Sequence, residues 1–288
     1  MKNPIINELS NLKLISKSSL VLLKNRTRDH KIKVFKDLKS KIIFLDKLIT
    51  NEKYYFTKKN TLKIKENIMI ERERVKTDDC RRASQFKSIL KNKSILDYGC
   101  GYGGFLMNLK NYKSLNGLEL RKDYIDYIRG KNKKINITNN INELNQKFDV
   151  ITMFHVLEHI PYQVDILKNL KSKLNKKGKI IIEVPHAEDF LLLQDDLDEF
   201  KDFTFWSEHL ILHTVKSLKK IILKAGFKKV KIQYYQRYNL ANHFGWFIKR
   251  KPGGHLFFKE YFDEQINKLY FENLKKLGQT DTLIAVAG

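Results

Sequence analysis

The feature that most constrains this chain is a glycine-rich turn set between a strand-like apolar run and a helix-like run. It reads ILDYGCGYGG at residues 95–104. Glycine adopts positive φ readily and lets the backbone approach a ligand without a Cβ in between. A strand, a glycine-rich turn and a helix in succession form the local context of a nucleotide-type binding site. The turn therefore predicts an α/β domain with a ligand at the end of its first strand.

From Lys93 onward, short apolar runs alternate with amphipathic ones. This alternation predicts buried strands separated by helices, hence a doubly wound, largely parallel sheet. A further amphipathic helix, a strand and the closing apolar run TLIAVAG extend the pattern. The expected strands cover 94–99, 114–120, 134–138, 148–154, 179–185, 228–236 and 282–288, and the expected helices cover 103–112, 122–130, 163–174 and 214–227.

The N-terminal part has a different texture. Residues 1–90 contain 23 Lys/Arg and 10 Asp/Glu, which is +13 of the chain's net +24, with one Pro and no Gly. We expect a basic, mostly helical extension over 1–75 and a catalytic domain over 76–288. Residues 54–70 could form a short hairpin or a lid. We also predict an amphipathic helix over 31–49. The apolar residues recur there at three- and four-residue spacing, at Ile32, Phe35, Leu38, Ile42, Leu45 and Ile49. This face could pack on the main domain, on a second subunit of a homodimer or on a membrane surface.

Composition limits the classes of protein. The cysteines are Cys80 and Cys100, too few for a disulfide framework or a four-cysteine zinc site. No apolar run approaches the ~20 residues that a membrane span needs, and the N-terminus lacks a signal-peptide pattern. We expect a cytoplasmic protein. The charge favours a phosphate-bearing partner, although a Lys-, Asn- and Ile-rich composition of the kind AT-rich coding produces explains the same excess.

Two acidic residues define the expected ligand. Asp97 precedes the first glycine and would repel a pyrophosphate, but it suits a ligand with an ammonium group. Glu119, about 20 residues on, ends the second strand, where an acid accepts hydrogen bonds from ribose hydroxyls. These two features fit S-adenosylmethionine better than NAD.

The segment around the turn resembles motif I of class I S-adenosylmethionine-dependent methyltransferases, and the resemblance continues along two-thirds of the chain. FDVI (148–151) with HVLEHI (155–160) is similar to the "FDVV…HVLEH" stretch of ubiquinone-type and sugar O-methyltransferases. LNKKGK (174–179) is similar to their "LKPGG" turn with Lys in place of Pro and the second Gly, and residues 208–227 resemble their "EH…FT…SL…AGF" block. The family implies a Rossmann-like seven-stranded sheet whose last strand is antiparallel. The expected cofactor contacts are Asp97, Tyr98, Gly99, Cys100, Gly101, Glu119, Leu120, Asn140, Ile141 and Phe154, those at Asn140 and Ile141 resting on the resemblance alone.

Histidines are the candidates for acid–base chemistry. In a doubly wound sheet the ligand lies at the carboxyl ends of the strands, which places His155 and His159 after the fourth strand and His186 after the fifth. His209 is placed there only by the resemblance. A hydroxyl acceptor of high pKa needs a general base, and His155 or His186 is favoured. Each could equally be a loop histidine that hydrogen-bonds the backbone.

Residues 155–159 also spell H-x-x-E-H, a zinc-protease pattern. That chemistry requires both histidines on one helix, whereas a strand enters this motif and Pro161 follows it. We therefore reject the protease interpretation. A metal held by some mixture of His155, His159, His209 and the acidic run 195–199 stays open, and no metal ligand is assigned.

The acceptor is least constrained. The resemblance favours a small hydroxyl-bearing molecule, and the charge suggests phosphate on it, as in a nucleotide-linked or phosphorylated sugar for surface polysaccharide. An RNA or DNA methyltransferase is the alternative, with the basic N-terminus binding nucleic acid. The Asn/Asp-Pro-Pro-aromatic tetrad of amino-directed enzymes is absent, because its position reads MFHV (153–156). A non-enzymatic cofactor-binding relative is the third class.

Overall fold

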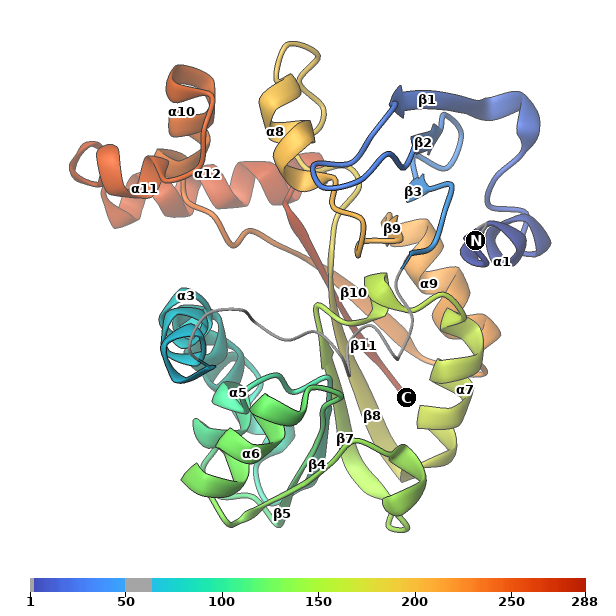
Figure 1. Ribbon diagram of the computed structural model, residues 1–288, viewed down its shortest axis with the longest axis vertical. Helices are drawn as coiled ribbons and strands as arrows, with labels where there is room; N and C mark the ends of the chain where they lie inside the picture. The colour runs from blue at the N-terminus through green and yellow to red at the C-terminus, as the bar shows by residue number, and fades with distance from the viewer. Residues whose placement is uncertain (1–2, 50–63) are drawn as a thin grey trace.

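The structure is a computed structural model, which describes residues 3–49 and 64–288 (Figure 1). The hairpin or lid expected at 54–70 lies outside the described residues up to position 63. Residues from Ile64 onward belong to helix α3 (Ile64–Gln85). In the part of the chain that the structure describes, no helix is long and apolar enough to cross a membrane.

Seven strands form the main sheet, in the order β10-β11-β8-β7-β4-β5-β6. The last strand in the chain, β11, is antiparallel to both of its neighbours, β8 and β10, and the other pairs are parallel. The predicted Rossmann-like sheet with an antiparallel last strand is thus confirmed. The strands are β4 (Ser94–Tyr98), β5 (Ser114–Leu118), β6 (Ile135–Thr138), β7 (Phe148–Phe154), β8 (Leu174–Pro185), β10 (Val230–Tyr235) and β11 (Thr282–Ala287).

Helices cover both faces of this sheet, because its strands bury side chains on both sides. Along β8, Ile180 and Ile182 enter the core beneath α7 and α9, whereas Ile181 enters the core on the opposite face. Figure 1 shows α7 and α9 on one side and α3, α5 and α6 on the other. These helices and the short helical turns among them are α4 (Lys87–Leu90), α5 (Gly104–Met107), α6 (Lys122–Lys131), η2 (Ile141–Glu143), η3 (Leu157–His159), α7 (Gln163–Ser172) and α9 (Val215–Lys224).

The N-terminal part contradicts the expectation of a mostly helical extension. Residues 31–49 form a β-hairpin instead of an amphipathic helix, and they join a second, antiparallel sheet in the order β1-β2-β3-β9. Leu38 and Ile49, expected on the apolar face, are 49% and 41% exposed. The elements are α1 (Ile5–Asn11), η1 (Lys17–Ser19), β1 (Leu20–Lys24), β2 (Val34–Asp37), β3 (Ile43–Leu45) and β9 (Ile211–Leu212).

A turn explains this difference. The buried Asp37 carboxylate accepts hydrogen bonds from the backbone N–H groups of Lys39 (3.0 Å) and Ser40 (2.7 Å), an arrangement in which Asp stabilises a turn. Lys41 has φ +63°, which ends any helix there. The three- and four-residue spacing of the apolar residues in 31–49 therefore arises from two strands separated by a turn, and not from a helix.

The N-terminal sheet is continuous with the main domain. Ile42 and Phe44 pack in the same core as α7 and α9, while Ile43 and Leu45 face the core beneath α8. This result corresponds to the expectation that the segment docks on the main domain. The division into domains at residue 75 stays a prediction, and it falls within α3.

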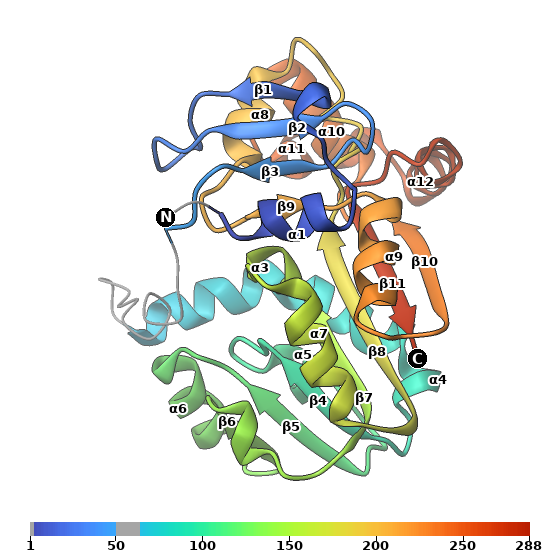
Figure 2. The ribbon, with the colours of Figure 1, turned by 90° about the vertical axis from the view of Figure 1, so that its right-hand side faces the viewer.

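A cap lies over the carboxyl ends of the parallel strands (Figure 2). It combines the second sheet with a group of helices from the C-terminal half, so the edge of the main sheet where ligands bind is covered. The cap helices are α8 (Asp198–Thr204), α10 (Leu240–Lys249), α11 (Gly254–Phe257), η4 (Lys259–Tyr261) and α12 (Glu264–Leu277).

Candidate cofactor and acceptor site

The site lies at the carboxyl ends of β4 and β7. The chain continues from β4 toward β5 and β6 on one side, and β7 and β8 lie on the other. Strand order reverses at this point, and in open α/β sheets such a reversal leaves a crevice that holds the ligand. The glycine-rich turn, residues 99–104, occupies this position, as predicted.

Backbone geometry at the turn requires glycine. Gly99 and Gly101 have φ of +76° and +54°, and a Cβ on Gly99 would lie 2.6 Å from Val156 Cγ2. A Cβ on Gly101 would meet no atom within 4 Å. The turn is thus closed against the segment after β7 at its first glycine and has open space at its second.

The structure brings Asp97 and Glu119 to this turn. Asp97 is 3% exposed and accepts a hydrogen bond from the Thr152 hydroxyl at 2.7 Å. Burial, with the charges of Asp79 and Glu119 adding to it, raises the pKa of Asp97 to about 7. A buried acid whose hydrogen-bond partner is neutral, in a region of negative potential, fits a ligand that carries positive charge. Adenosylmethionine has an ammonium and a sulfonium group.

Glu119 is held against the turn by the backbone. Its Oε2 accepts from Gly101 N–H at 2.8 Å and its Oε1 from the N–H groups of Leu120 (2.8 Å) and Arg121 (2.9 Å). Burial raises the pKa of Glu119 despite these hydrogen bonds. Oε2 accepts only one hydrogen bond and keeps a second lone pair, so it can also receive a ribose hydroxyl.

The other expected cofactor contacts differ in their exposure and in the residues that they contact. Tyr98, Leu120 and Ile141 are half-buried, and Asn140 is exposed, with its Oδ1 accepting from Asn142 N–H at 3.0 Å. Cys100 packs in the core with its thiol turned toward Gly117. The Phe154 ring lies edge-on to Phe105, with the Arg82 guanidinium 4.7 Å from its centroid. The roles proposed for these residues stay predictions.

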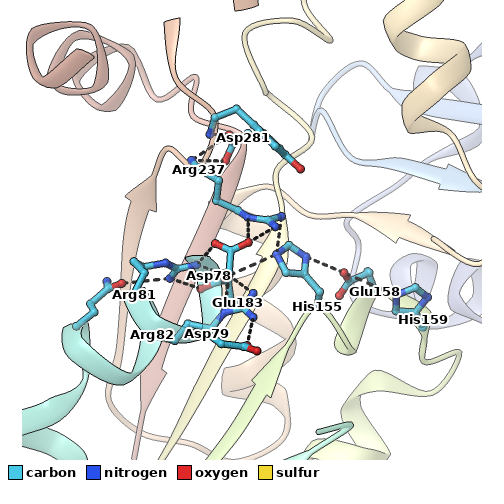
Figure 3. Close-up of polar contacts among 12 residues, drawn as sticks. Asp78, Asp79, Arg81, Arg82, His155, Glu158, His159, Glu183, Arg237 and Asp281 are labelled. Carbon is cyan, nitrogen blue, oxygen red and sulfur yellow. Dashed lines mark hydrogen bonds and ion pairs between the residues drawn. The ribbon is translucent and has the colours of Figure 1, made fainter. Parts of the chain in front are cut away.

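An ion network beside the turn was not expected from the sequence (Figure 3). Glu183, fully buried on β8, accepts from Arg81 Nη1 at 2.7 Å and from Arg82 Nη2 at 2.6 Å, both on α3. Burial alone would raise the pKa of Glu183, but hydrogen bonds from His155 and Arg81 and the Arg82 charge hold it well below its usual value. Asp79, also on α3, accepts from the Tyr102 hydroxyl at 2.6 Å, which ties this helix to the turn.

Arg237 completes the network from the segment after β10. It forms an ion pair with Asp78, and its Nη1 lies 3.0 Å from His155 Nε2. Burial opposes ionisation of Asp78, but the Arg237 charge outweighs it and lowers the pKa of Asp78 to about 2. A sequence signal for this network exists in hindsight: Glu183 interrupts the apolar run KIIIEVP, and a buried acid requires cationic partners.

His155 has the geometry of an oriented base. It follows β7 with φ +54°, an uncommon conformation for a residue with a side chain. Its Nδ1 lies 3.2 Å from Glu158 Oε1, and its Nε2 faces Arg237. The same Nε2 also lies 3.4 Å from Glu183 Oε1, so it contacts a guanidinium and a carboxylate together. The side chain is 23% exposed, so an acceptor can reach it.

His159 and His209 lie together, on the other side of Glu158 from His155. Their ring centroids are 4.9 Å apart, and His159 Nδ1 donates to the Glu208 carbonyl at 2.9 Å. Burial, with the His159 charge adding to it, lowers the pKa of His209 to about 3. The segment 157–159 is a single 3-10 turn, which agrees with rejecting a zinc protease on one continuous helix.

His186 is enclosed. It is 1% exposed, its Nδ1 donates to the Thr280 carbonyl at 2.8 Å, and burial lowers its pKa to about 4. Of the two favoured bases, His155 is therefore the more exposed. The acidic run 195–199 lies elsewhere and pairs with Lys24, Lys201 and Arg250.

Residues 70–232 match the family described as a methyltransferase domain. The chain belongs to this family. Over 155 residues, the methyltransferase is 32% identical to the tRNA U34 carboxymethyltransferase of Nautilia profundicola, covering 49% of this chain and 50% of that protein. Over 101 residues it is 30% identical to the ubiquinone biosynthesis O-methyltransferase of Coxiella burnetii, covering 32% and 43%. The chain thus spans about half the length of the curated relatives it matches.

A solved structure shows the same fold. The SAM-dependent methyltransferase from Archaeoglobus fulgidus superposes with a TM-score of 0.50 at 19% identity, covering 76% of this chain and 98% of that one. The chain therefore carries a methyltransferase domain of the S-adenosylmethionine-dependent type. The glycine turn, Asp97 and Glu119 are the residues that we expect to hold this cofactor.

Proposed function

We propose that this methyltransferase methylates a hydroxyl group of a small, phosphate-bearing acceptor, with a nucleotide-linked sugar as the first class to test. The observation that carries the proposal is His155 just after β7, with Glu158 at its Nδ1 and Arg237 at its Nε2. A sugar hydroxyl has a high pKa and needs a base during methyl transfer, whereas an amine does not.

The reaction requires few catalytic groups from the chain. The bound cofactor supplies an electrophilic methyl group, so catalysis consists mainly of positioning the acceptor oxygen in line with it. Nε2 of His155 would take the hydroxyl proton as the methyl group passes from the cofactor's sulfur to the acceptor oxygen, and Glu158 would stabilise the imidazolium through Nδ1. Arg237 must release Nε2 for this step, and an anionic acceptor offers it an alternative partner.

Access and charge support a small anionic acceptor. The His155 side chain is only 23% exposed, and Arg237 and Glu183 lie against its Nε2. A folded polynucleotide cannot bring an acceptor atom to so enclosed a side chain without extruding a base. The net charge of +24 raises the local concentration of anions around the protein.

Nucleic acid is the second candidate. The relative from Nautilia profundicola is named for a tRNA substrate, and the same net charge favours binding to a phosphate backbone. This alternative needs the base of a single nucleotide to reach His155.

The test is transfer of labelled methyl from adenosylmethionine to three acceptor sets: nucleotide-linked sugars, phenolic quinone precursors and total tRNA. We expect alkali-stable label in a nucleotide-sugar. His155→Gln should lower kcat by about 10²- to 10⁴-fold while adenosylhomocysteine affinity is kept, and the exposed His30→Gln is the matched control. Label in tRNA alone, or full kcat in His155→Gln, would overturn the proposal.

A further inference from the structure

A second group of potential ligands lies next to the proposed base, and it shares Glu158 with the steps above. Glu158, His159 and His209 each offer one donor atom, and these three atoms lie within 4.8 Å of one another. They come from η3 and from the segment that precedes β9. The backbone joins these segments, since Leu210 N–H donates to the Glu158 carbonyl at 2.9 Å.

Two of these side chains have buried atoms without a partner. Within residues 3–49 and 64–288, Glu158 Oε2 and His209 Nδ1 are buried and accept or donate no hydrogen bond. Glu158 is 0% exposed. A carboxylate oxygen buried in this way is costly unless something binds it. Figure 3 shows the Glu158 carboxylate between the rings of His155 and His159.

We propose that Glu158, His159 and His209 bind one divalent transition-metal ion, and that Zn²⁺ suits the set best. Two imidazoles and a carboxylate with a free fourth position form a known zinc ligand set, and imidazole disfavours Mg²⁺. The distance from Glu158 Oε1 to His159 Nε2 is 3.9 Å, too long for a hydrogen bond. The edge of a tetrahedral zinc site is roughly 3.4 Å, given metal–ligand distances of about 2.0–2.1 Å, so small side-chain rotations close the site.

Outer partners already orient these ligands. His159 donates its Nδ1–H to the Glu208 carbonyl, which leaves the Nε2 lone pair for a metal. His155 binds Glu158 Oε1. The His159 side chain is 19% exposed, which gives an ion a path from solvent and leaves the fourth position for water or an acceptor oxygen. The proposed metal site depends on the family assignment and on this geometry, and it does not depend on the class of acceptor.

The experiment measures metal on the untagged full-length chain after chelator treatment. Equilibrium dialysis against Zn²⁺ with elemental analysis gives the stoichiometry, and Co²⁺ substitution gives a visible spectrum that reports tetrahedral nitrogen and oxygen ligands. The ligand variants are Glu158→Gln and His209→Ala, and the exposed His255→Ala is the matched control. Adenosylhomocysteine binding by each variant reports whether it folds.

We expect one Zn²⁺ per chain in the wild-type protein and in His255→Ala, with no competition from Mg²⁺. Affinity should fall by on the order of 100-fold in either ligand variant, since loss of even an outer-shell partner costs about 10- to 100-fold. Equal zinc binding by wild type and His209→Ala, or a Co²⁺ spectrum unchanged by that substitution, would overturn the site. Because the readout is bound metal, this result is separate from the outcome of the acceptor assay.

Discussion

Asp97 shows how a single buried residue selects a ligand. Its carboxyl is 3% exposed, and burial, followed by the charges of Asp79 and Glu119, raises its pKa to about 7. Such a group is ionised only in part near neutral pH. An ammonium group restores its charge, whereas a pyrophosphate disfavours it, so the residue favours adenosylmethionine over a dinucleotide.

The affinity for adenosylhomocysteine should therefore depend on pH through Asp97. Because the ammonium binds the ionised carboxylate, affinity should fall by about tenfold per pH unit below 7 and level off above it. Calorimetric titration across this range measures the slope, and Asp97→Asn should remove it. The same slope in the variant would mean that another group is responsible.

The raised pKa of Asp97 also makes the free energy of unfolding depend on pH. The folded-state pKa of Asp97, about 7, exceeds its usual value of 3.8, so the folded state binds the proton more tightly. The contribution of Asp97 to stability is complete below about pH 4 and is lost as the pH rises toward 7. Urea unfolding of wild type and Asp97→Asn, in the absence of cofactor, should show this loss only in the wild type.

At the scale of elements, the N-terminal hairpin depends on Asp37. Its carboxylate accepts from the backbone of Lys39, Ser40 and Ser16 and from the Ser19 hydroxyl, and it is 1% exposed. One side chain thus holds the β2–β3 turn and the approach to β1. The edge strand β9 pairs with β3 and depends on the same turn.

Asp37→Ala should lower the free energy of unfolding by about 1–3 kcal/mol, because it leaves buried N–H groups without an acceptor. Urea denaturation measures the loss. The exposed Lys39→Ala in the same turn is the control and should change stability little, since its backbone N–H is kept. Equal losses in both variants would show that the turn is held by other contacts.

The sequence predicted the main sheet far better than the N-terminal one. Strands 148–154 and 179–185 are mostly apolar runs next to amphipathic helices, so their type was evident from the residues alone, although β8 begins earlier, at Leu174. Residues 31–49 carry an accidental helical spacing, and the turn at Asp37 has no Gly or Pro to mark it. No expectation was made for the helices of 238–277, although Ile266, Leu269, Tyr270 and Leu274 recur there at helical spacing.

The candidate site was predictable in its cofactor half. Asp97, the glycine turn and Glu119 follow one another at fixed spacing within one βαβ unit, and the structure brings them together. The acceptor half is assembled from α3, β8 and the segment after β10. Arg82 and Glu183 are 101 residues apart in the chain, and only the fold makes their contact visible.

On the scale of the whole molecule, the positive charge and the cap both bear on which acceptor can reach the site. The net charge is +24, and the cap covers the carboxyl edge of the sheet. The field of the surface would attract the anionic acceptor that we propose, and the enclosure of His155 favours a small one. The interactions of exposed charges are screened over about 10 Å at 0.1 M salt, so this attraction depends on ionic strength.

If the acceptor carries phosphate, its KM should rise several-fold as ionic strength increases, while kcat changes little. Initial rates at increasing salt concentration measure this directly. An acceptor analogue without the phosphate is the control and should show a flat KM. A salt-independent KM for the phosphorylated acceptor would remove the role assigned to the surface charge.

The central claim is that the glycine turn, Asp97 and Glu119 bind the adenosylmethionine-type cofactor. Calorimetric titration of the wild-type chain with adenosylhomocysteine and, separately, with NAD tests it most directly. We predict one adenosylhomocysteine per chain, no heat from NAD, and affinity about 10- to 100-fold weaker in Glu119→Gln, which loses a charged hydrogen bond to ribose. Binding of NAD, or wild-type affinity in Glu119→Gln, would contradict the account of this site.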